Sequence, residues 1–305
     1  MKNSKSFGLI FTFVMTIIGS IIGAGFASGK EVLTFFASYG WIAYILIGVA
    51  ILLFGFTFFV FTEVGRKLRP HNFSEISKAI FGKAYVVFDV IIMLCLFVVI
   101  SAMFAGADSL AVSYFGEKYS FPWLSILTGV VVVLVLSGGK NSMFNASKVI
   151  VPIIVLLIIG VITAFFIVAP KEVITVIPET TTQSVFKGIL FACLYVGLNT
   201  MTECFIVARA SEGMNKKQNL TASIITSAFL GIMIVLITLA LLNSSDIIFR
   251  ADMPLVKIAN LTNDILGNIY GLVLWLAILT TAIASVYTLT SWLKQFINNK
   301  FTCTC

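Results

Sequence analysis

The chain has 305 residues, of which 59% are hydrophobic and 11% are charged, and its mean hydropathy is +1.08. This composition excludes an ordinary soluble globular protein, in which about 25% of residues are charged. The formal net charge of +7 raises nucleic acid as a partner, but no basic cluster is interleaved with aromatic residues, so we expect no nucleic-acid binding. Several apolar runs of about 18 or more residues instead predict an all-α polytopic membrane protein.

The sequence offers no constellation of residues for catalysis. It holds a single histidine, His71, and its five cysteines give neither a CxxC pair nor the spacing of metal ligands. The Gly-Gly-Lys sequence at 138–140 lacks the spacing of a phosphate-binding P-loop. We therefore expect neither an enzyme nor a resident cofactor.

The chain is expected to form a single transmembrane domain over residues 1–305. Its eight apolar segments are residues 7–39, 41–65, 84–112, 121–136, 149–168, 185–208, 220–242 and 265–296. A short amphipathic stretch, residues 72–81, is expected to lie on the membrane surface. Residues 137–148 and 171–183 are expected to be loops, and Pro254 is suited to the first turn of a short helix over 255–261.

Lysine and arginine are unevenly distributed over the expected loops. Alternate loops, starting with the N-terminus, carry most of them, and the opposite loops carry only Lys118, Lys171, Arg250 and Lys257. Loops rich in lysine and arginine stay in the cytoplasm, so this alternation predicts a cytoplasmic N-terminus.

The first apolar segment contains the sequence Gly-Ser-Ile-Ile-Gly-Ala-Gly-Phe-Ala-Ser-Gly-Lys-Glu at residues 19–31. As one helix, residues 7–39 would extend roughly 50 Å, well beyond the roughly 30 Å of membrane hydrocarbon. Each glycine inside a helix costs up to about 1 kcal/mol relative to alanine, so four close together favour a break. We expect two half-helices joined by unwound backbone, as at the binding site of a secondary transporter. The alternative is that Gly19/Gly23 and Gly25/Gly29 are two GxxxG pairs for close helix packing.

This break is expected to form half of a substrate site. The residues that would line it are Gly23, Ala24, Gly25, Phe26 and Ser28. Free amides at residues 27–30 would begin the outer half-helix and attract an anionic group such as a carboxylate. Carbonyls at residues 19–23 would end the inner half-helix and face a cation. Lys30 and Glu31 are expected to act in gating or coupling.

The sixth segment is expected to break in the same way, with Gly197 as the hinge. Its polar residues would complete the substrate site: Tyr195, Asn199, Thr200 and Glu203. A charge at membrane depth costs about 2.5–3.5 kcal/mol on insertion scales, so Glu203 should face a cavity or a partner. Alternatively, Glu203 lies close enough to the cytoplasmic end to reach water or to pair with Arg209.

Two further segments carry polar residues at informative positions. In the eighth, Ala277, Thr280 and Thr281 share one helical face, so they would present one carbonyl and two hydroxyls together. The alternative is that the threonines bond only to their own helix. In the third, Asp89 and Asp108 lie near opposite ends, so both are expected to be exposed at the membrane interfaces.

The first and sixth segments are five helices apart and would start on opposite sides of the membrane, as in an inverted repeat. Together with the motif at 19–31, this order resembles the LeuT-fold, amino acid–polyamine–organocation superfamily, and within it the YkvI-type family of bacterial membrane proteins. The resemblance implies a LeuT-like inverted repeat with helices 1 and 6 broken. Residues 1–168 would form the first five-helix repeat, and residues 185–305 a second that lacks the last two of the usual ten helices.

The resemblance also implies a function. The implied protein is a secondary active transporter in the bacterial plasma (inner) membrane. It would be a symporter that carries a small amino-acid-like or organic-cation solute by alternating access, coupled to Na+ or H+. In sodium-coupled members, a trio like that of the eighth segment holds the ion with carbonyls of the first break. The match places Gly19 and Ile22 opposite Ala277, Thr280 and Thr281. The alternative is a sensor or receptor subunit of the same fold that binds its ligand without carrying it. The expected partners are the solute and the lipid bilayer, with the oligomeric state open.

Overall fold

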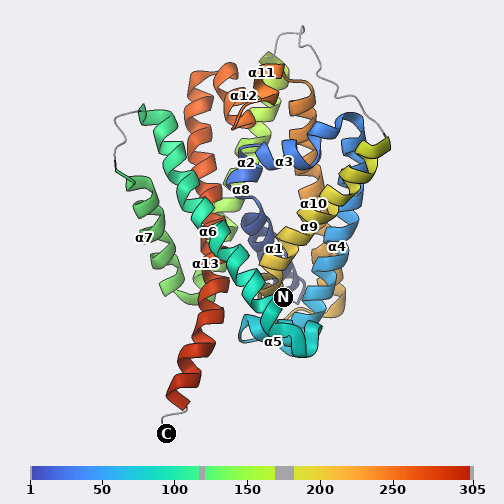
Figure 1. The fold of residues 1–305 in the computed structure, drawn as a ribbon, viewed down its shortest axis with the longest axis vertical. Helices are drawn as coiled ribbons and strands as arrows, with labels where there is room; N and C mark the ends of the chain where they lie inside the picture. The colour runs from blue at the N-terminus through green and yellow to red at the C-terminus, as the bar shows by residue number, and fades with distance from the viewer. Residues whose placement is uncertain (1, 117–120, 169–181, 303–305) are drawn as a thin grey trace.

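A computed structural model describes residues 2–116, 121–168 and 182–302 of the chain (Figure 1). Within these residues the structure is all-helical and contains no strand. Six helices in this part are long and apolar enough to cross a membrane, and two shorter apolar helices, Ser6–Ile21 and Trp123–Ser137, accompany them. The expected all-α membrane architecture is therefore confirmed at this level.

The first apolar segment is interrupted, as its glycines predict. Helix α1 (Lys2–Ile21) ends before Gly23, the four-residue α2 (Ala24–Ala27) follows, and α3 (Lys30–Phe35) begins after Gly29. Gly29 has φ +82°, a left-handed conformation that glycine adopts without steric cost. The segment is thus a 20-residue helix followed by two short ones, rather than one continuous helix.

A 3-10 helix, η1 (Ala37–Ile42), leads into the long helix α4 (Ala43–Leu68). The expected surface helix is α5 (Phe73–Phe81), where the Asn72 side chain caps the first turn by accepting a hydrogen bond from the Glu75 amide at 3.1 Å. A second 3-10 helix, η2 (Gly82–Ala84), then leads into the third long helix.

Helix α6 (Tyr85–Phe115) packs against α5, and its Asp89 is only 3% exposed. The Ser74 hydroxyl of α5 donates a hydrogen bond to the Asp89 carboxylate, so the expectation that Asp89 is exposed is wrong. Asp108 is also partly covered, because both the amide and the hydroxyl of Ser125 donate to it.

Helices α7 (Trp123–Ser137) and α8 (Gly139–Val168) follow, and only Gly138 separates them in the sequence. Most of the expected linker 137–148 is therefore the first part of α8. The reason is its periodicity: Met143, Ser147 and Val151 are spaced by four residues and are all buried. Pro152 lies inside α8 and leaves one helical hydrogen bond unmade.

Helix α9 (Thr182–Ala210) is continuous, so the expected break at Gly197 is wrong. One glycine costs a helix only about 1 kcal/mol, and the polar residues around it do not require an opening. The Asn199 amide group donates to the carbonyl of Tyr195 at 2.9 Å, and the Thr200 hydroxyl donates to the carbonyl of Val196 at 2.6 Å. Most of the preceding expected loop, residues 169–181, lies outside the described residues.

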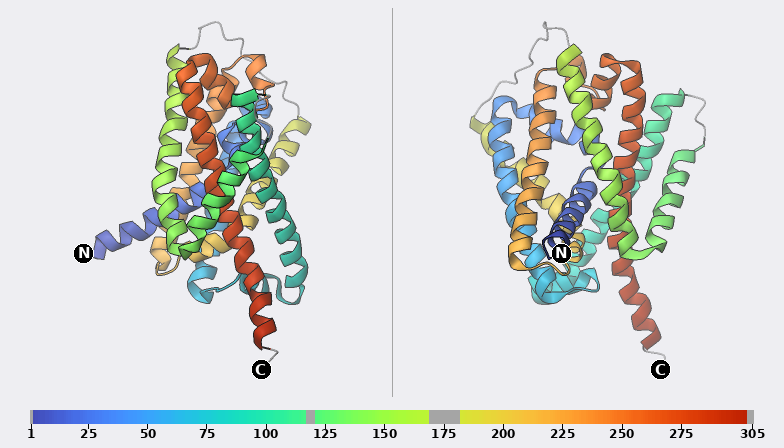
Figure 2. Two further views of the ribbon diagram at one scale, coloured as in Figure 1. Left: turned by 90° about the vertical axis from the view of Figure 1, so that its left-hand side faces the viewer. Right: turned by 180° about the vertical axis from the view of Figure 1, so that it is seen from behind.

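The rest of the chain is α10 (Lys216–Leu242), α11 (Asp246–Phe249), α12 (Pro254–Thr262) and α13 (Asp264–Thr302). Helix α12 begins at Pro254, as predicted. Helix α13 crosses the bundle and extends beyond it toward the C-terminus (Figure 2).

The start of α1 projects from the bundle, whereas its end, α2 and α3 lie inside it (Figure 2). Helix α1 packs against α8, α9, α10 and α13, so helices from both halves of the chain surround it (Figure 1). Helix α5 lies at one end of the bundle and α11 and α12 at the other; we call these the α5 end and the α12 end. Large apolar side chains such as Leu52, Phe97 and Leu156 are well exposed on the outer surface, which fits a protein embedded in a lipid bilayer.

Candidate functional site

The break between α1 and α2 leaves backbone carbonyls that the helix does not use. The Gly23 amide donates to the Ile21 carbonyl at 2.8 Å instead of continuing the helix to the Gly19 carbonyl. The hydroxyl of Thr281, on α13, lies 3.1 Å from the Ser20 carbonyl oxygen and 3.5 Å from that of Gly19. A side chain from the far end of the sequence therefore supplies the donor that the broken helix lacks.

The structure brings together only part of the expected cation site. Thr281 meets the Gly19 carbonyl, whereas the Thr280 hydroxyl donates to the carbonyls of Leu276 and Ala277 in its own helix, at 3.2 and 3.0 Å. The alternative reading therefore holds for Thr280. Ala277 and Ile22 are both fully buried.

The glycines around the break act in two ways. A Cβ atom on Gly19 would overlap the side chain of Val151, so this glycine allows α1 to pack closely on α8, as the GxxxG alternative proposes. A Cβ atom on Gly23 would lie 3.0 Å from the Thr281 hydroxyl oxygen. The same motif thus serves both helix packing and the interruption.

The outer side of the break does not offer the expected free amides. The amides of Ala27, Ser28 and Gly29 donate to backbone carbonyls at 2.8–3.0 Å, and the Lys30 amide lies 3.4 Å from the Ser28 hydroxyl. The prediction of free amides for an anion at residues 27–30 is therefore wrong, because the helical turn of α2 and the turn at Gly29 use these donors.

Two distant elements hold this turn in place. The buried Tyr270 of α13 donates its hydroxyl to the Ala27 carbonyl at 2.7 Å, and the Leu255 amide of α12 donates to the Ser28 carbonyl at 2.9 Å. The sequence reading missed Tyr270. The available signal was a tyrosine in an apolar helix, whose hydroxyl needs a partner when buried.

Lys30 and Glu31 point in different directions from the start of α3. The ammonium group of Lys30 lies 3.6 Å from the Asp252 carboxylate and 3.4 Å from the Ala251 carbonyl, at the α12 end. The Glu31 side chain instead folds back over α2, where a Cβ atom on Gly25 would overlap it. The glycine therefore provides the space that the carboxyl group occupies.

Tyr195 of α9 faces the same region. Its ring packs against Phe35, Phe36 and Phe54, with centroid distances of 5.1, 5.3 and 6.0 Å. The side chain is 1% exposed, and its hydroxyl has no hydrogen-bond partner among the described residues. A buried hydroxyl without a partner is uncommon in folded proteins and indicates a place for a ligand or water.

Glu203 lies on the other side of the break. It is 3% exposed, its side chain interacts with Ser20 of α1, and its Oε2 atom has no hydrogen-bond partner in the described part of the chain. The alternative pairing with Arg209 is not formed, because Arg209 pairs with Glu212 at 2.5 Å. Since Ser20 precedes the break and Gly25 follows it, the carboxyl groups of Glu203 and Glu31 flank it.

The other expected site residues contribute less. Asn199 and Thr200 bond to their own helix, and the space around Gly197 is open within 4 Å of a Cβ position. Phe26 is fully buried, while Ala24 and Gly25 are half-buried. The assembled part of the predicted substrate site is therefore Gly23, Gly25, Tyr195 and Glu203, together with Glu31.

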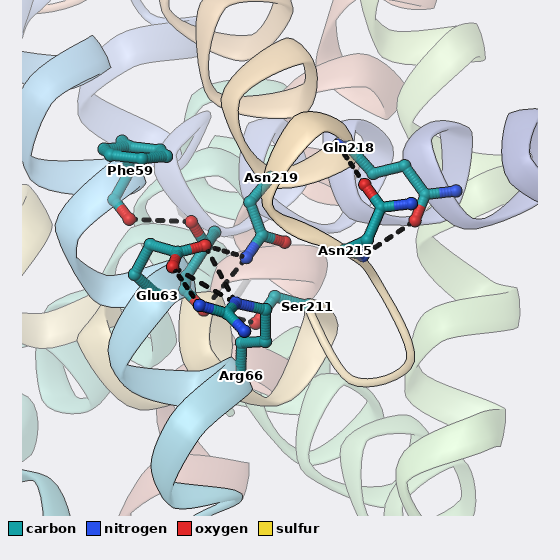
Figure 3. A network of polar contacts seen from close by, with 8 residues as sticks. Phe59, Glu63, Arg66, Ser211, Asn215, Gln218 and Asn219 are labelled. Carbon is teal, nitrogen blue, oxygen red and sulfur yellow. Dashed lines mark hydrogen bonds and ion pairs between the residues drawn. The ribbon is translucent and has the colours of Figure 1, made fainter.

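A polar network at the α5 end was not anticipated. Glu63 accepts hydrogen bonds from Arg66 at 2.6 Å and from the Asn219 amide group at 2.8 Å, which ties α4 to α10 (Figure 3). Asn215 and Gln218 form a capping box at the start of α10 beside it. These contacts join the end of α4 to the start of α10 at the α5 end, whereas Lys30 lies at the α12 end.

Comparison with known proteins finds two similar chains, both from Bacillus subtilis (strain 168). The uncharacterized membrane protein YkvI is 23% identical over 299 residues, which cover 97% of this chain and 84% of YkvI. The uncharacterized protein YyaD is 23% identical over 288 residues, covering 94% of this chain and 82% of YyaD. No protein-family model matches the chain. The similarity supports a bacterial membrane protein built of several spanning helices.

Proposed function

We propose that this protein is a secondary active transporter that carries a small organic-cation or amino-acid-like solute by alternating access, coupled to Na+ or H+. The observation that carries the proposal is the interrupted segment α1–α2–α3, flanked by the partly buried carboxyl group of Glu31 and the buried carboxyl group of Glu203. Non-helical backbone at membrane depth is stable only where protein or a polar cavity receives its polar groups. Transporters place such interruptions at the binding site.

The charges around the break favour a cationic group on the solute. In the part of the chain that the structure describes, neither Glu31 nor Glu203 has an ion-pair partner. A buried charge is costly unless it is compensated, so an ammonium group or a coupling proton is the natural complement. The ring and hydroxyl of Tyr195 add a face that attracts cations and an unused polar group.

Coupling to Na+ is supported by the oxygen atoms at the inner side of the break. The carbonyls of Gly19 and Ser20 converge on the Thr281 hydroxyl, and ligation by oxygen alone suits a hard cation. The excess of basic residues at the α5 end favours a cytoplasmic position for that end, with the N-terminus on the same side.

A membrane-embedded ligand sensor is the second candidate, and the continuous α9 favours it. Alternating access in an inverted repeat relies on two interrupted helices, whereas this chain has one in the described residues. A sensor needs a binding site but no second hinge.

The first experiment is a thermal-shift screen of the purified protein with amino acids and quaternary amines, in Na+ or K+ at equal ionic strength and at two pH values. A ligand present at 100 times its Kd should stabilise the protein by about 2.7 kcal/mol. We expect a cationic solute to stabilise the wild type. A Na+ effect should be lost in Thr281→Val and retained in Thr280→Val, whose hydroxyl bonds only within α13.

Uptake into proteoliposomes separates the two candidates. A transporter accumulates the stabilising solute when a Na+ or pH gradient is imposed, and Glu203→Gln should reduce this accumulation. Binding without uptake under either gradient would favour the sensor. The absence of both binding and uptake across the screen would refute the placement of a solute site at the break.

A further inference from the structure

A second polar region lies at the α5 end, away from the interrupted segment. Three cavities open there, with volumes of about 690, 380 and 360 Å³, and Lys140 and Arg209 line all three. The charged and imidazole side chains lining the largest cavity are Arg66, Arg69, His71, Lys140, Arg209 and Glu212. Four permanent cations therefore share this cavity with one carboxylate.

The carboxylates nearby do not neutralise this charge. Glu212 bridges Lys140 and Arg209, at 2.5 Å from each. Glu63 neutralises Arg66 at 2.6 Å. Glu75 accepts hydrogen bonds from the His71 amide and the Asn72 side chain at the same end. Arg69 has no ion-pair partner in the described part of the chain, so the four cations still outnumber the three carboxylates.

Arg209 presents an unused donor within this region. Its Nη1 group donates to Glu212 and, at 3.1 Å, to the Pro70 carbonyl. Its Nε atom is buried and has no hydrogen-bond partner among the described residues. A buried donor without an acceptor is unfavourable, and an anion beside it would supply the acceptor.

The backbone conformation of Arg69 is a second, independent sign that this cavity binds an anion. Arg69 ends α4 in the left-handed conformation, with φ 46° and ψ 59°, and it is the only residue other than glycine with positive φ in the described part of the chain. Residues other than glycine, asparagine and aspartate rarely take this conformation, because it strains the backbone. The fold thus keeps an arginine at the edge of the cavity although its backbone conformation is unfavourable.

We propose that this cavity binds the phosphate group of an anionic ligand, either a phospholipid headgroup or a soluble phosphate ester. Arginine side chains match the oxygen atoms of phosphate with paired hydrogen bonds, and basic pockets between membrane helices at the cytoplasmic side hold lipid headgroups. The bound phosphate contacts residues at the ends of α4 and α9 and the start of α8. This site is independent of the solute site at the break.

The test uses Arg69→Asn and a matched control, Lys67→Asn. Asparagine tolerates the left-handed conformation, so Arg69→Asn removes the charge without adding strain, and the unliganded variant should unfold at or above the wild-type temperature. Lys67 is an exposed cation two residues earlier that does not line the cavity. The two variants change the net charge of the protein equally.

Binding is measured by thermal shift and by native mass spectrometry of the full chain in neutral detergent. The probes are phosphatidylglycerol, phosphatidylcholine as the zwitterionic control, and inorganic phosphate against chloride at equal ionic strength. We expect the affinity for the effective probe to fall about tenfold or more in Arg69→Asn and less than twofold in Lys67→Asn. Selective binding of phosphatidylglycerol identifies a lipid headgroup, and selective binding of inorganic phosphate identifies a soluble ligand.

Three results would overturn the proposal. One is the absence of binding of both phosphatidylglycerol and phosphate to the wild type. Another is an equal loss of affinity in the two variants, which would reflect net charge alone. The third is equal binding of phosphatidylcholine and phosphatidylglycerol, which would show that the anionic headgroup does not matter.

Discussion

Replacing Gly65 by alanine tests the closest approach between two long helices. A Cβ atom at this position of α4 would overlap the carbonyl oxygen of Ala208 and would lie 2.7 Å from the Ala208 Cα atom. These are backbone atoms of α9, so no side chain can turn aside, and the two helices must separate locally. The hydroxyl of Ser211, which donates to the Thr62 carbonyl at 3.3 Å, would also be displaced.

The expected change in stability follows from two opposing effects. Overpacking a well-filled contact costs about 1–3 kcal/mol, and the backbone obstacle at Ala208 places this case in the upper part of that range. Removing a glycine from a helix interior returns about 0.5–1 kcal/mol. We therefore expect Gly65→Ala to destabilise the protein by about 1–2 kcal/mol, measured as a lower thermal unfolding midpoint in detergent.

Gly48→Ala is the matched control in the same helix. No atom lies within 4 Å of a Cβ position at Gly48, so this variant should be as stable as the wild type or more stable by about 0.5–1 kcal/mol. A Gly65→Ala protein at least as stable as the wild type would refute the close approach of α4 and α9. An equal loss in the two variants would show that the contact is not the cause.

Two further substitutions test individual hydrogen bonds with the same assay. Asn215→Ala removes the capping box of α10 and should cost about 1 kcal/mol. Asn145 is exposed and its amide oxygen accepts only from Lys148, so Asn145→Ala should change stability by less than about 0.5 kcal/mol; similar values for the two variants would contradict the cap. Tyr270→Phe leaves the Ala27 carbonyl without its 2.7 Å donor and should lower stability by about 1 kcal/mol, with faster amide hydrogen exchange in α2 and α3; unchanged exchange there would show that the hydroxyl does not hold the turn.

The interruption of the first segment could be predicted because its cause is local. Four glycines lie within residues 19–29, and together they make a continuous helix expensive. The continuous α9 could not be distinguished in the same way. Asn199 and Thr200 are polar groups in an apolar segment, which predicts a cavity beside them. Either side chain can instead bond to the preceding turn of its own helix, and the sequence does not determine which partner it takes.

Other features depend on contacts between distant parts of the chain. The polar residues of 137–148 suggested a loop, yet burial of Met143 and Ser147 extends α8 through them, since tertiary packing overrides a weak local preference. The bond between Tyr270 and Ala27 joins positions 243 residues apart, which no local pattern reveals. The sequence likewise does not reveal that the Glu212 carboxylate pairs with both Lys140 and Arg209.

Pro152 makes α8 easiest to bend near the level at which α1 stops. Its ring nitrogen carries no hydrogen for the Lys148 carbonyl, and a helix bends most readily where such a bond is missing. The preceding residue, Val151, packs directly on Gly19, shortly before α1 ends. The break at the end of α1 and the weakened turn of α8 therefore lie side by side in neighbouring helices, whereas α9 has no such interruption.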